Sequence, residues 1–459
     1  MAHSGTKTLV VALAFALASC AVLASACLAS DVTFEFAADG GASATAALQA
    51  AVDKVSASGG GTVRVPAGSY VTAGLCLKDN VTLLLEENAV LLGATNHLEY
   101  AGRPLAVVSA TGAQNVAIVG KGTIDGRGWA SLRRDGAPHR WKDCFFFRCR
   151  GVRMEGVRLV APASWTCYFK ECDGVVARGV TIHGHVNFNN DGFDIDSKNV
   201  LIEDCTVDSD DDAICLKSDN PDFVCENVEV RNCRLSSNCN FIKFGTASHG
   251  GFRNCNIHHC TLIASETSVL RKWVGLPGVT DKCTGLAGIA LEMVDGGVME
   301  NVHVHDITML DGVQTPILVR LARRRTHKSG AKSFLRNVLI ENVTSKSTAS
   351  IIASSITGVP GLRPSGVTLR NLDLVVKGGG RASHAAAKVP EVEKCYPENR
   401  MFKTPLPAYG FYVRHADGVR FENVKLRWAG GAEEREAVVQ DDCTGVVFEG
   451  CDFQPPVKR

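Results

Sequence analysis

Short segments in which apolar and polar positions alternate recur along this chain. Residues 199–209 read NVLIEDCTVDS, residues 227–237 read NVEVRNCRLSS, and residues 445–453 repeat the design as GVVFEGCDF. Alternation with a period of two is typical of strands that bury one face, and Asn, Asp or Gly stands where the chain must turn. The pattern predicts a repeating unit of two short strands that meet at a corner.

Looser copies of this unit extend from about residue 115 to the end, at 151–159, 174–182, 297–307, 366–374 and 418–426. Repeats of roughly 20–30 residues are typical of solenoids, in which each coil buries its apolar face only by stacking on its neighbours. We therefore predict an all-β fold, a right-handed parallel β-helix that forms one domain over residues 31–459. A β-sandwich is the alternative, but it does not explain repetition along the whole chain. The Leu-x-x-Leu-x-Leu pattern of leucine-rich repeats does not recur.

The segment before the repeats has a different period. Residues 43–57 place Leu48, Ala51, Val52 and Val55 at helical spacing, which predicts a short helix covering the open N-terminal end of the solenoid. Two polar stretches, 323–333 and 377–394, interrupt the repeat and are expected to be loops, on the substrate face if they are functional.

The first thirty residues have the form of an export signal. Lys7 precedes an apolar run over 9–17, and Ala24-Ser25-Ala26 has the form of a signal-peptidase site, so residues 1–30 are predicted to be a signal peptide of a secreted, periplasmic or cell-surface protein. Leu17-Ala18-Ser19-Cys20 also resembles a lipobox, which makes a lipid anchor at Cys20 the only expected link to a membrane. An uncleaved membrane anchor is disfavoured by the two serines and two cysteines within the apolar stretch that continues to Leu28.

The charge balance argues against nucleic-acid binding, and the cysteine spacing indicates how the thiols are used. Lys and Arg number 49 against 48 Asp and Glu, so no global basic field is available for nucleic acid. Cys205, Cys233 and Cys260 recur at coil spacing in similar surroundings. Because cysteine is a small and often buried hydrophobe, we expect an interior column of thiols rather than a zinc site, although disulfides are an alternative in an exported chain.

The candidate catalytic residues are concentrated in two acidic segments. Asn189-Asn190-Asp191-Gly192 precedes one strand-like segment, and Asp210-Asp211-Asp212 precedes the next, with Asp191 and Asp212 one coil apart. Equivalent positions in successive coils are separated by one strand spacing, about 4.8 Å. Carboxylates that close raise each other's pKa, which favours a protonated acid beside an ionised base, as glycoside hydrolysis requires. The alternative reading is turn stabilisation or a calcium site.

These segments resemble the Asn-Thr-Asp and Asp-Asp motifs of glycoside hydrolase family 28, the polygalacturonases and their relatives. GGGTVRVPAGSY from Gly59, GKGTIDGRGW from Gly120 and APASWTCYF from Ala161 also resemble landmarks of that family, so the resemblance covers about residues 31–455. It implies an inverting hydrolase of pectin or a related wall polysaccharide. Asp211 would be the general acid, and Asp191 and Asp212 would hold and activate water. No cofactor or metal is implied, and we expect a monomer. A β-helix polysaccharide lyase and a non-catalytic carbohydrate-binding β-helix are the alternative functions.

The sequence departs from the family where the substrate carboxylate is bound. Asn240 stands at the position of the family's His, and Ala290 and Glu292 stand where an Arg and a Lys are expected. We predict that substrate contacts are redistributed, with Lys243 or Arg320 as a displaced carboxylate clamp and Glu292 on sugar hydroxyls. The predicted substrate-binding residues are Asn189, Asn240, Lys243, His249, Glu292 and Arg320. Tyr396, Phe402, Tyr409, Phe411 and Tyr412 are candidates for stacking on sugar faces or for packing.

Overall fold

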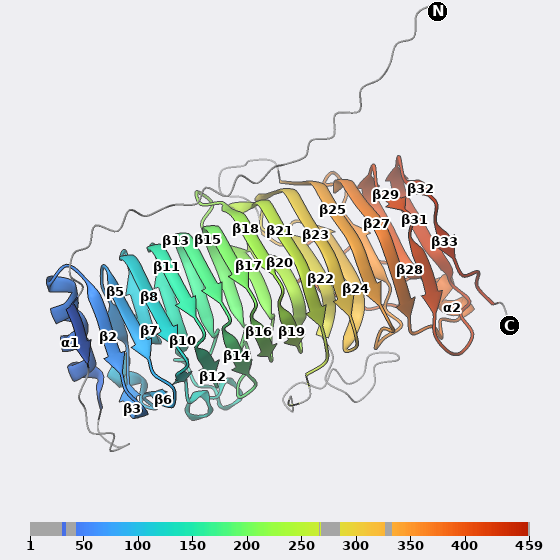
Figure 1. Cartoon of the computed structure of the whole chain (residues 1–459). Helices are drawn as coiled ribbons and strands as arrows, with labels where there is room; N and C mark the ends of the chain where they lie inside the picture. The colour runs from blue at the N-terminus through green and yellow to red at the C-terminus, as the bar shows by residue number, and fades with distance from the viewer. Residues whose placement is uncertain (1–29, 34–42, 266, 268–284, 326–332, 458–459) are drawn as a thin grey trace, which may run out of the picture.

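The strands coil into one elongated stack that begins at helix α1 (Thr45–Ala57) and ends at the C-terminal strands (Figure 1). The structure is a computed structural model that describes residues 30–33, 43–265, 267, 285–325 and 333–457. All pairings between its named strands are parallel. Connections between parallel strands of one sheet are right-handed, and the predicted right-handed parallel β-helix is confirmed.

Three parallel sheets form the sides of the helix, and we name them sheets A, B and C. Sheet A contains β1 (Ser30–Thr33), β2 (Gly61–Val65), β5 (Val81–Leu85), β8 (Gln114–Gly120), β11 (Arg150–Glu155), β18 (Cys225–Arg231), β29 (Arg420–Glu422) and β32 (Val447–Glu449). Sheet B contains β4 (Leu75–Leu77), β7 (Ala106–Thr111), β10 (Lys142–Phe147), β17 (Ile214–Ser218), β20 (Asn240–Ser248), β22 (Gly285–Met293), β24 (Val313–Leu321), β26 (Ser354–Thr357), β28 (Ala408–Asp417) and β31 (Glu436–Thr444).

Sheet C contains β3 (Gly68–Thr72), β6 (Ala89–Gly93), β9 (Thr123–Asp125), β12 (Arg158–Val160), β14 (Thr181–Gly184), β16 (Thr206–Ser209), β19 (Arg234–Ser237), β30 (Lys425–Trp428) and β33 (Asp452–Phe453). Six long strands bend from one sheet into the next. β13 (Cys167–Arg178) and β15 (Phe193–Glu203) pass from sheet B to sheet A, and β21 (Gly251–Leu262), β23 (Val298–Met309), β25 (Phe334–Ser345) and β27 (Ser365–Val376) pass from sheet A to sheet C.

The N-terminal cap forms as the sequence predicts. Helix α1 buries Leu48, Ala51, Val52 and Val55 against the first coil. Ser58 is the C-cap residue of this helix. Short helices also occur outside the strands: α2 (Ala382–Ala385), η1 (His97–Tyr100), η2 (Gly128–Ala130) and η3 (Arg133–Asp135). Among the described residues no helix combines the length and apolarity needed to cross a bilayer. The predicted signal peptide and the lipobox lie outside the described residues.

One corner of the helix is formed by asparagines in the left-handed region. Asn199, Asn227 and Asn254 have φ of 54–56°, a conformation that Asn tolerates better than most residues. Their side chains form a ladder: Nδ2 of Asn227 donates to Oδ1 of Asn199 at 3.0 Å, and Nδ2 of Asn254 donates to Oδ1 of Asn227 at 3.3 Å. The recurring Asn therefore sets both the turn and the contact between coils.

The interior contains the predicted thiol column. Cys205, Cys233 and Cys260 are all buried, one in each of three successive coils. Within the described part of the chain every cysteine is a free thiol. The disulfide alternative therefore does not hold for these residues, because the thiols pack as small apolar groups inside the coils.

Candidate active site

Backbone register places Asp191 beside Asp212 at the start of two adjacent sheet B strands. Phe193 in β15 pairs with Ile214 in β17, and the Gly192 N–H donates to the Asp212 carbonyl at 2.8 Å. A Cβ on Gly192 would lie 2.4 Å from the Ala213 carbonyl oxygen, so this close approach requires glycine. The one-coil spacing of the two aspartates is confirmed.

Asp211 is held at the same edge by its backbone and its carboxylate. The hydroxyls of Ser209 and Ser237 donate to the Asp211 carbonyl at 2.8 and 2.7 Å. Its Oδ2 accepts from Nδ2 of Asn189 at 3.2 Å, and its Oδ1 accepts from the Asp212 N–H at 3.1 Å. Ligand atoms of Asp211 and Asp212 lie within 4.8 Å of each other, as do those of Asp191 and Asp212. Three carboxylates therefore converge.

Asp212 is held in its ionised form. Its Oδ2 lies 3.0 Å from the Lys243 ammonium, and its Oδ1 accepts hydrogen bonds from the backbone and side-chain nitrogens of Asn240 at 3.1 and 2.7 Å. Burial raises the pKa of Asp212, but Lys243, Lys217 and the Asn240 hydrogen bond outweigh it and lower the pKa to about 2. Asp212 thus carries a negative charge at any physiological pH.

Asp191 has the opposite tendency. Its side chain is almost completely buried, and its Oδ1 has no hydrogen-bond partner among the described residues. Burial, followed by the charges of Asp194 and Asp211, raises the pKa of Asp191 well above its usual range, although Lys217 lies 3.5 Å away. Neighbouring carboxylates with pKa values pushed apart can share one proton, which is the arrangement expected of acid and base partners.

Lys217 is a site residue that the sequence analysis did not identify. Its ammonium lies 3.1 Å from Asp194 Oδ1 and 4.8 Å from the centre of the Trp165 ring. The sequence signal was its position in β17, where Cys215 and Lys217 alternate with core residues and share the face that holds Asp212. Lys217 therefore neutralises the side of the cluster opposite Lys243.

Lys243 is bound by the protein itself. Its ammonium contacts Asp212 at 3.0 Å, Glu292 at 3.7 Å and the Tyr396 hydroxyl at 3.2 Å. Glu292 is completely buried, and burial, with the Lys243 charge opposing it, raises its pKa to about 7. The Tyr396 side chain stands over the lysine and is 52% exposed, whereas Phe402, Tyr409, Phe411 and Tyr412 are buried. Of the five predicted aromatics, Tyr396 is thus the one exposed enough to meet a sugar.

Asn189 connects the aspartates to two arginines that the sequence analysis also missed. It adopts the left-handed conformation with φ of 56°. Its Oδ1 accepts from Arg140 at 3.3 Å and also from Arg133, while Arg140 donates to the Phe188 carbonyl at 2.7 Å. Burial lowers the pKa of Arg140, and Arg133 lowers it further. Two cations therefore border the carboxylate cluster.

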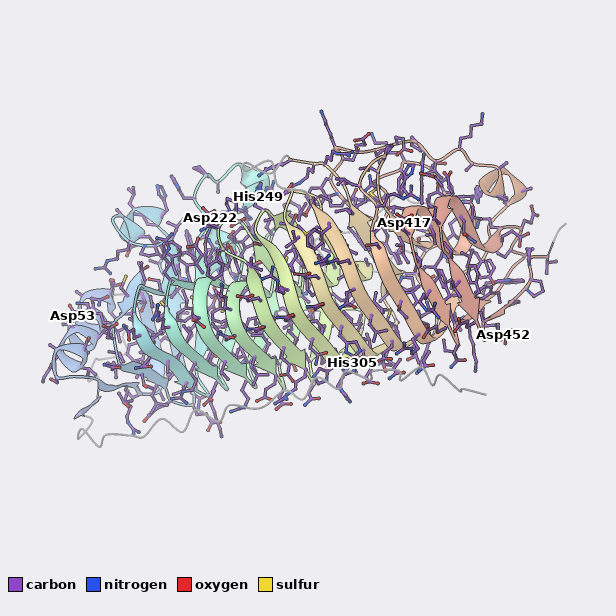
Figure 2. The ribbon with its side chains drawn as sticks, turned by 90° about the horizontal axis from the view of Figure 1, so that it is seen from above. Asp53, Asp222, His249, His305, Asp417 and Asp452 are labelled. Atoms are coloured by element: carbon purple, nitrogen blue, oxygen red, sulfur yellow. The ribbon has the colours of Figure 1, made fainter. Side chains whose placement is uncertain are left out.

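Two predicted residues do not join the cluster. His249 follows β20, donates its backbone N–H to the Ser218 carbonyl at 2.7 Å, and lies at the edge of the strands (Figure 2). Arg320 is almost fully buried, and its guanidinium donates to the carbonyls of Gly358 at 2.8 Å and Val392 at 3.0 Å. These contacts make Arg320 a link between β24 and the loop before β28.

The aspartate cluster also contains a group of three potential metal ligands. Asp191, Asp212 and Cys215 bring ligand atoms within 4.8 Å of one another. Calcium prefers six to eight oxygen ligands, and a thiol is not among them. The ammonium groups of Lys217 and Lys243 lie 3.5 and 3.0 Å from these carboxylates, where they supply the positive charge. The donor set therefore does not fit the calcium alternative.

Comparison with known proteins assigns the family. The sequence profile of glycosyl hydrolases family 28 matches residues 56–395. The chain belongs to this family. A probable polygalacturonase of Vitis vinifera is 26% identical over 314 residues, which are 61% of this chain and 60% of the relative. An endo-polygalacturonase of Pectobacterium carotovorum subsp. carotovorum is 24% identical over 365 residues, with 72% of this chain and 84% of the relative covered. The chain thus spans only about 60% of the length of the grape relative.

Solved structures of family 28 share the fold. The exopolygalacturonase of Yersinia enterocolitica superimposes with a TM-score of 0.68 at 17% identity, covering 93% of this chain and 79% of that one. The exopolygalacturonase of Thermotoga maritima gives a TM-score of 0.64 at 18% identity, covering 88% and 92%. Asn240, which the sequence analysis expects at the position of the family's His, donates from its side chain to Asp212 at 2.7 Å.

Proposed function

We propose that this chain hydrolyses glycosidic bonds in pectin or a related wall polysaccharide, outside the cell and as a monomer, with inversion at the anomeric carbon. The observation that supports this most directly is the convergence of Asp211, Asp191 and Asp212 at one edge of sheet B, where Lys243 and Asn240 hold Asp212 ionised as the base. A hydrolase needs one group to give a proton and another to take one. The family's known members in the comparison include polygalacturonases.

In the proposed reaction Asp211 protonates the glycosidic oxygen as the bond to the anomeric carbon breaks. A water molecule between Asp191 and Asp212 attacks that carbon, and its proton passes to ionised Asp212. Proton exchange with solvent then returns Asp211 to its acid form and Asp212 to its ionised form. Asn189 holds Oδ2 of Asp211, and Lys243 and Asn240 hold Asp212, so both groups are oriented before substrate binds.

Carboxylate spacing by itself does not predict the stereochemistry. The ligand atoms of Asp211 and Asp212 lie within 4.8 Å, whereas most inverting glycosidases separate their two carboxyl groups by roughly 6.5–9.5 Å and retaining enzymes by roughly 5–5.5 Å. Three carboxylates converge here, and two of them are available to hold one water. Proton NMR of the first-formed anomer tests inversion directly, and a product of retained configuration would contradict it.

We propose that this chain binds the substrate carboxylate elsewhere than at positions 290 and 292, where Ala290 and Glu292 offer no cation. The Lys243 ammonium already forms ion pairs with Asp212 and Glu292. It is therefore not free to bind a substrate carboxylate. Arg133 and Arg140 border the other side of the cluster, and the exposed Tyr396 offers a ring for a sugar face. We propose that a uronate carboxylate binds on the arginine side and that Tyr396 stacks on the chain.

The central experiment is Asp211→Asn assayed on polygalacturonate, rhamnogalacturonan and neutral glycans. Turnover is expected to fall by roughly 10²-fold or more, as loss of a general acid predicts, while folding measured by circular dichroism is unchanged. Asp222→Asn is the matched control, because Asp222 is exposed on a turn and is not a member of the three-aspartate cluster. Near-normal turnover in folded Asp211→Asn would reject the assignment.

Product analysis separates the alternatives. Release of reducing ends without new ultraviolet absorbance supports hydrolysis, whereas unsaturated products would show a lyase. Binding without any product on the whole panel would show a non-catalytic carbohydrate-binding protein. Size-exclusion chromatography tests the monomer, and the mass of the mature protein recovered from the producing cells tests cleavage of the signal against lipid attachment at Cys20.

A further inference from the structure

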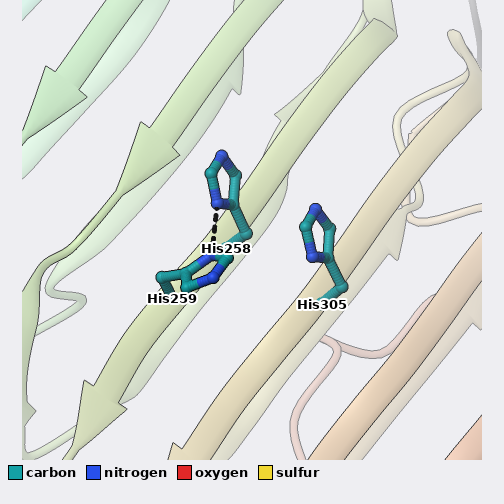
Figure 3. A group of neighbouring side chains, drawn as sticks. All are labelled: His258, His259 and His305. Carbon is teal, nitrogen blue, oxygen red and sulfur yellow. Dashed lines mark hydrogen bonds between the residues drawn. The ribbon is translucent and has the colours of Figure 1, made fainter. Parts of the chain in front are cut away.

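Three histidines gather on the outer face of sheet A, whereas the catalytic aspartates lie at the edge of sheet B. His258 and His259 belong to β21, and His305 belongs to β23 in the next coil (Figure 3). His258 is the register partner of His305. One ring nitrogen of each histidine lies within 4.8 Å of those of the other two. Residues 47 positions apart in the chain therefore form one group of imidazoles.

The rings are held in place by carboxylates around them. Nε2 of His258 lies 3.2 Å from Glu229, and Nδ1 of His305 lies 2.6 Å from Oδ2 of Asp306. Nε2 of His259 faces the same Asp306 oxygen at 3.8 Å. The rings of His258 and His305 are parallel, with 2° between their planes and 4.7 Å between their centres. Carboxylates on the outer nitrogens of histidines are the usual second layer of a metal site.

Two ring nitrogens of the group face each other directly. Nδ1 of His258 and Nδ1 of His259 lie 2.7 Å apart. Nε2 of His258 faces Glu229 at 3.2 Å, and a carboxylate only accepts, so a neutral His258 ring carries its hydrogen on Nε2 and presents the lone pair of Nδ1 to His259. A metal ion can take this lone pair in place of the hydrogen that His259 otherwise donates.

We propose that His258, His259 and His305 bind a divalent late transition-metal ion such as Zn²⁺, which fastens the β21 and β23 coils to each other. Imidazole nitrogens suit zinc, copper and nickel. Nitrogens about 2.0–2.1 Å from a zinc ion lie roughly 3.3 Å apart in a tetrahedron, so the His305 nitrogen, now within 4.8 Å of the others, must move toward the β21 pair by up to about 1.5 Å. The His305 ring must also turn out of its parallel stack with His258, so that both lone pairs point at one ion. Asp306, already in contact with His305, is placed to act as a fourth ligand or to orient the ring.

The position in the fold favours a structural role. His258 and His305 are partly shielded, with 14% and 18% of their side chains exposed, while His259 is 57% exposed. The site is therefore reachable from solvent but backed by the sheet. Because the metal site lies on sheet A and the aspartates lie at sheet B, metal binding is expected to stabilise the fold without changing hydrolysis.

The test uses the full chain without a polyhistidine tag, stripped with chelator and titrated with Zn²⁺ and Co²⁺. We expect about one tightly bound ion by elemental analysis, a tetrahedral Co²⁺ spectrum, and a melting temperature that rises with Zn²⁺ concentration. His258→Gln and His305→Gln are expected to weaken Zn²⁺ binding by at least about tenfold. Glu229→Gln, which keeps all three ligands, is expected to weaken it less.

Two control variants separate this site from other histidines. His97→Gln removes half of an exposed pair in which His97 stacks on His139 at 4.7 Å. His183→Gln removes one member of another group, formed by His183, His185 and Asp208. Both controls should bind Zn²⁺ as the unmodified chain does. Unchanged affinity in folded His258→Gln and His305→Gln, or loss of binding only in His183→Gln, would overturn the proposal. Failure of both Zn²⁺ and Co²⁺ to bind would also overturn it, and a hydrogen bond between the His258 and His259 rings would then account for the short contact by itself.

Discussion

The ammonium of Lys243 lies 3.0 Å from Oδ2 of Asp212, although the two residues belong to successive coils. This contact accounts for much of the low pKa of Asp212, since burial alone would raise it. It also explains why Lys243 differs from a free clamp for substrate, because its charge is shared with Glu292.

Lys243→Met is expected to lower turnover by roughly 10- to 100-fold, with little change in KM, because Asp212 loses the cation that keeps it ionised. The acid limb of the pH–rate profile should shift to higher pH, since a larger fraction of Asp212 is then protonated at low pH. Lys198→Met is the control, because Lys198 also pairs with a carboxylate, Glu226 at 3.0 Å, away from the site. An unshifted acid limb would contradict the role given to Lys243.

Arg140→Gln is expected to raise KM for polygalacturonate several-fold while leaving kcat and activity on any neutral glycan nearly unchanged. The reason is that Arg140 borders the cluster beside Asn189 and is proposed to meet a uronate carboxylate. Steady-state kinetics at two salt concentrations provide the measurement, with exposed Arg150→Gln as the control. Equal losses on charged and neutral substrates would show that Arg140 only positions the loop.

Glu292→Gln is expected to remove part of the pH dependence of stability. The pKa of Glu292 is about 7 in the folded chain against 4.5 as its ordinary value, so the folded state binds the proton more tightly. Its contribution is present below pH 4.5 and is lost as pH rises through 7, by up to about 3 kcal/mol. Denaturant unfolding between pH 4.5 and 8 should give a shallower fall for the variant, since Asp194 and Asp196 still contribute. Identical slopes in the variant and the unmodified chain would refute the assignment, and exposed Glu436→Gln should change nothing.

Asn227→Ala is expected to lower the free energy of unfolding by about 1–2 kcal/mol. The substitution removes two ladder hydrogen bonds. It also places alanine, which has no polar side chain to stabilise the left-handed backbone conformation, at φ of 56°. Asn227→Gly also removes the two hydrogen bonds, but glycine adopts this backbone conformation without strain. Urea unfolding should therefore rank the native chain first, the Gly variant second and the Ala variant last. A Gly variant less stable than the Ala variant would be evidence against a strained corner.

The repeat and the main chemistry could be predicted from local patterns. The period of two in segments such as 199–209, the recurring Asn at the corner and the apolar spacing of 43–57 are each visible within one coil, and the structure forms them as predicted. The placement of Asp191 beside Asp212 needed one further rule, the strand spacing between coils. The signal peptide and the function of the predicted substrate-binding residues remain predictions.

The sequence by itself determined the parallel β-helix and the aspartate cluster, because both follow from spacing within or between adjacent coils. Only the tertiary structure decided which charges surround the cluster. Tyr396 meets Lys243 across 153 positions in sequence, and Arg320 is bound by backbone carbonyls away from the aspartates. The physical reason is that loops such as the one carrying Tyr396 have no repeat to fix their path, so their partners depend on how the whole stack folds.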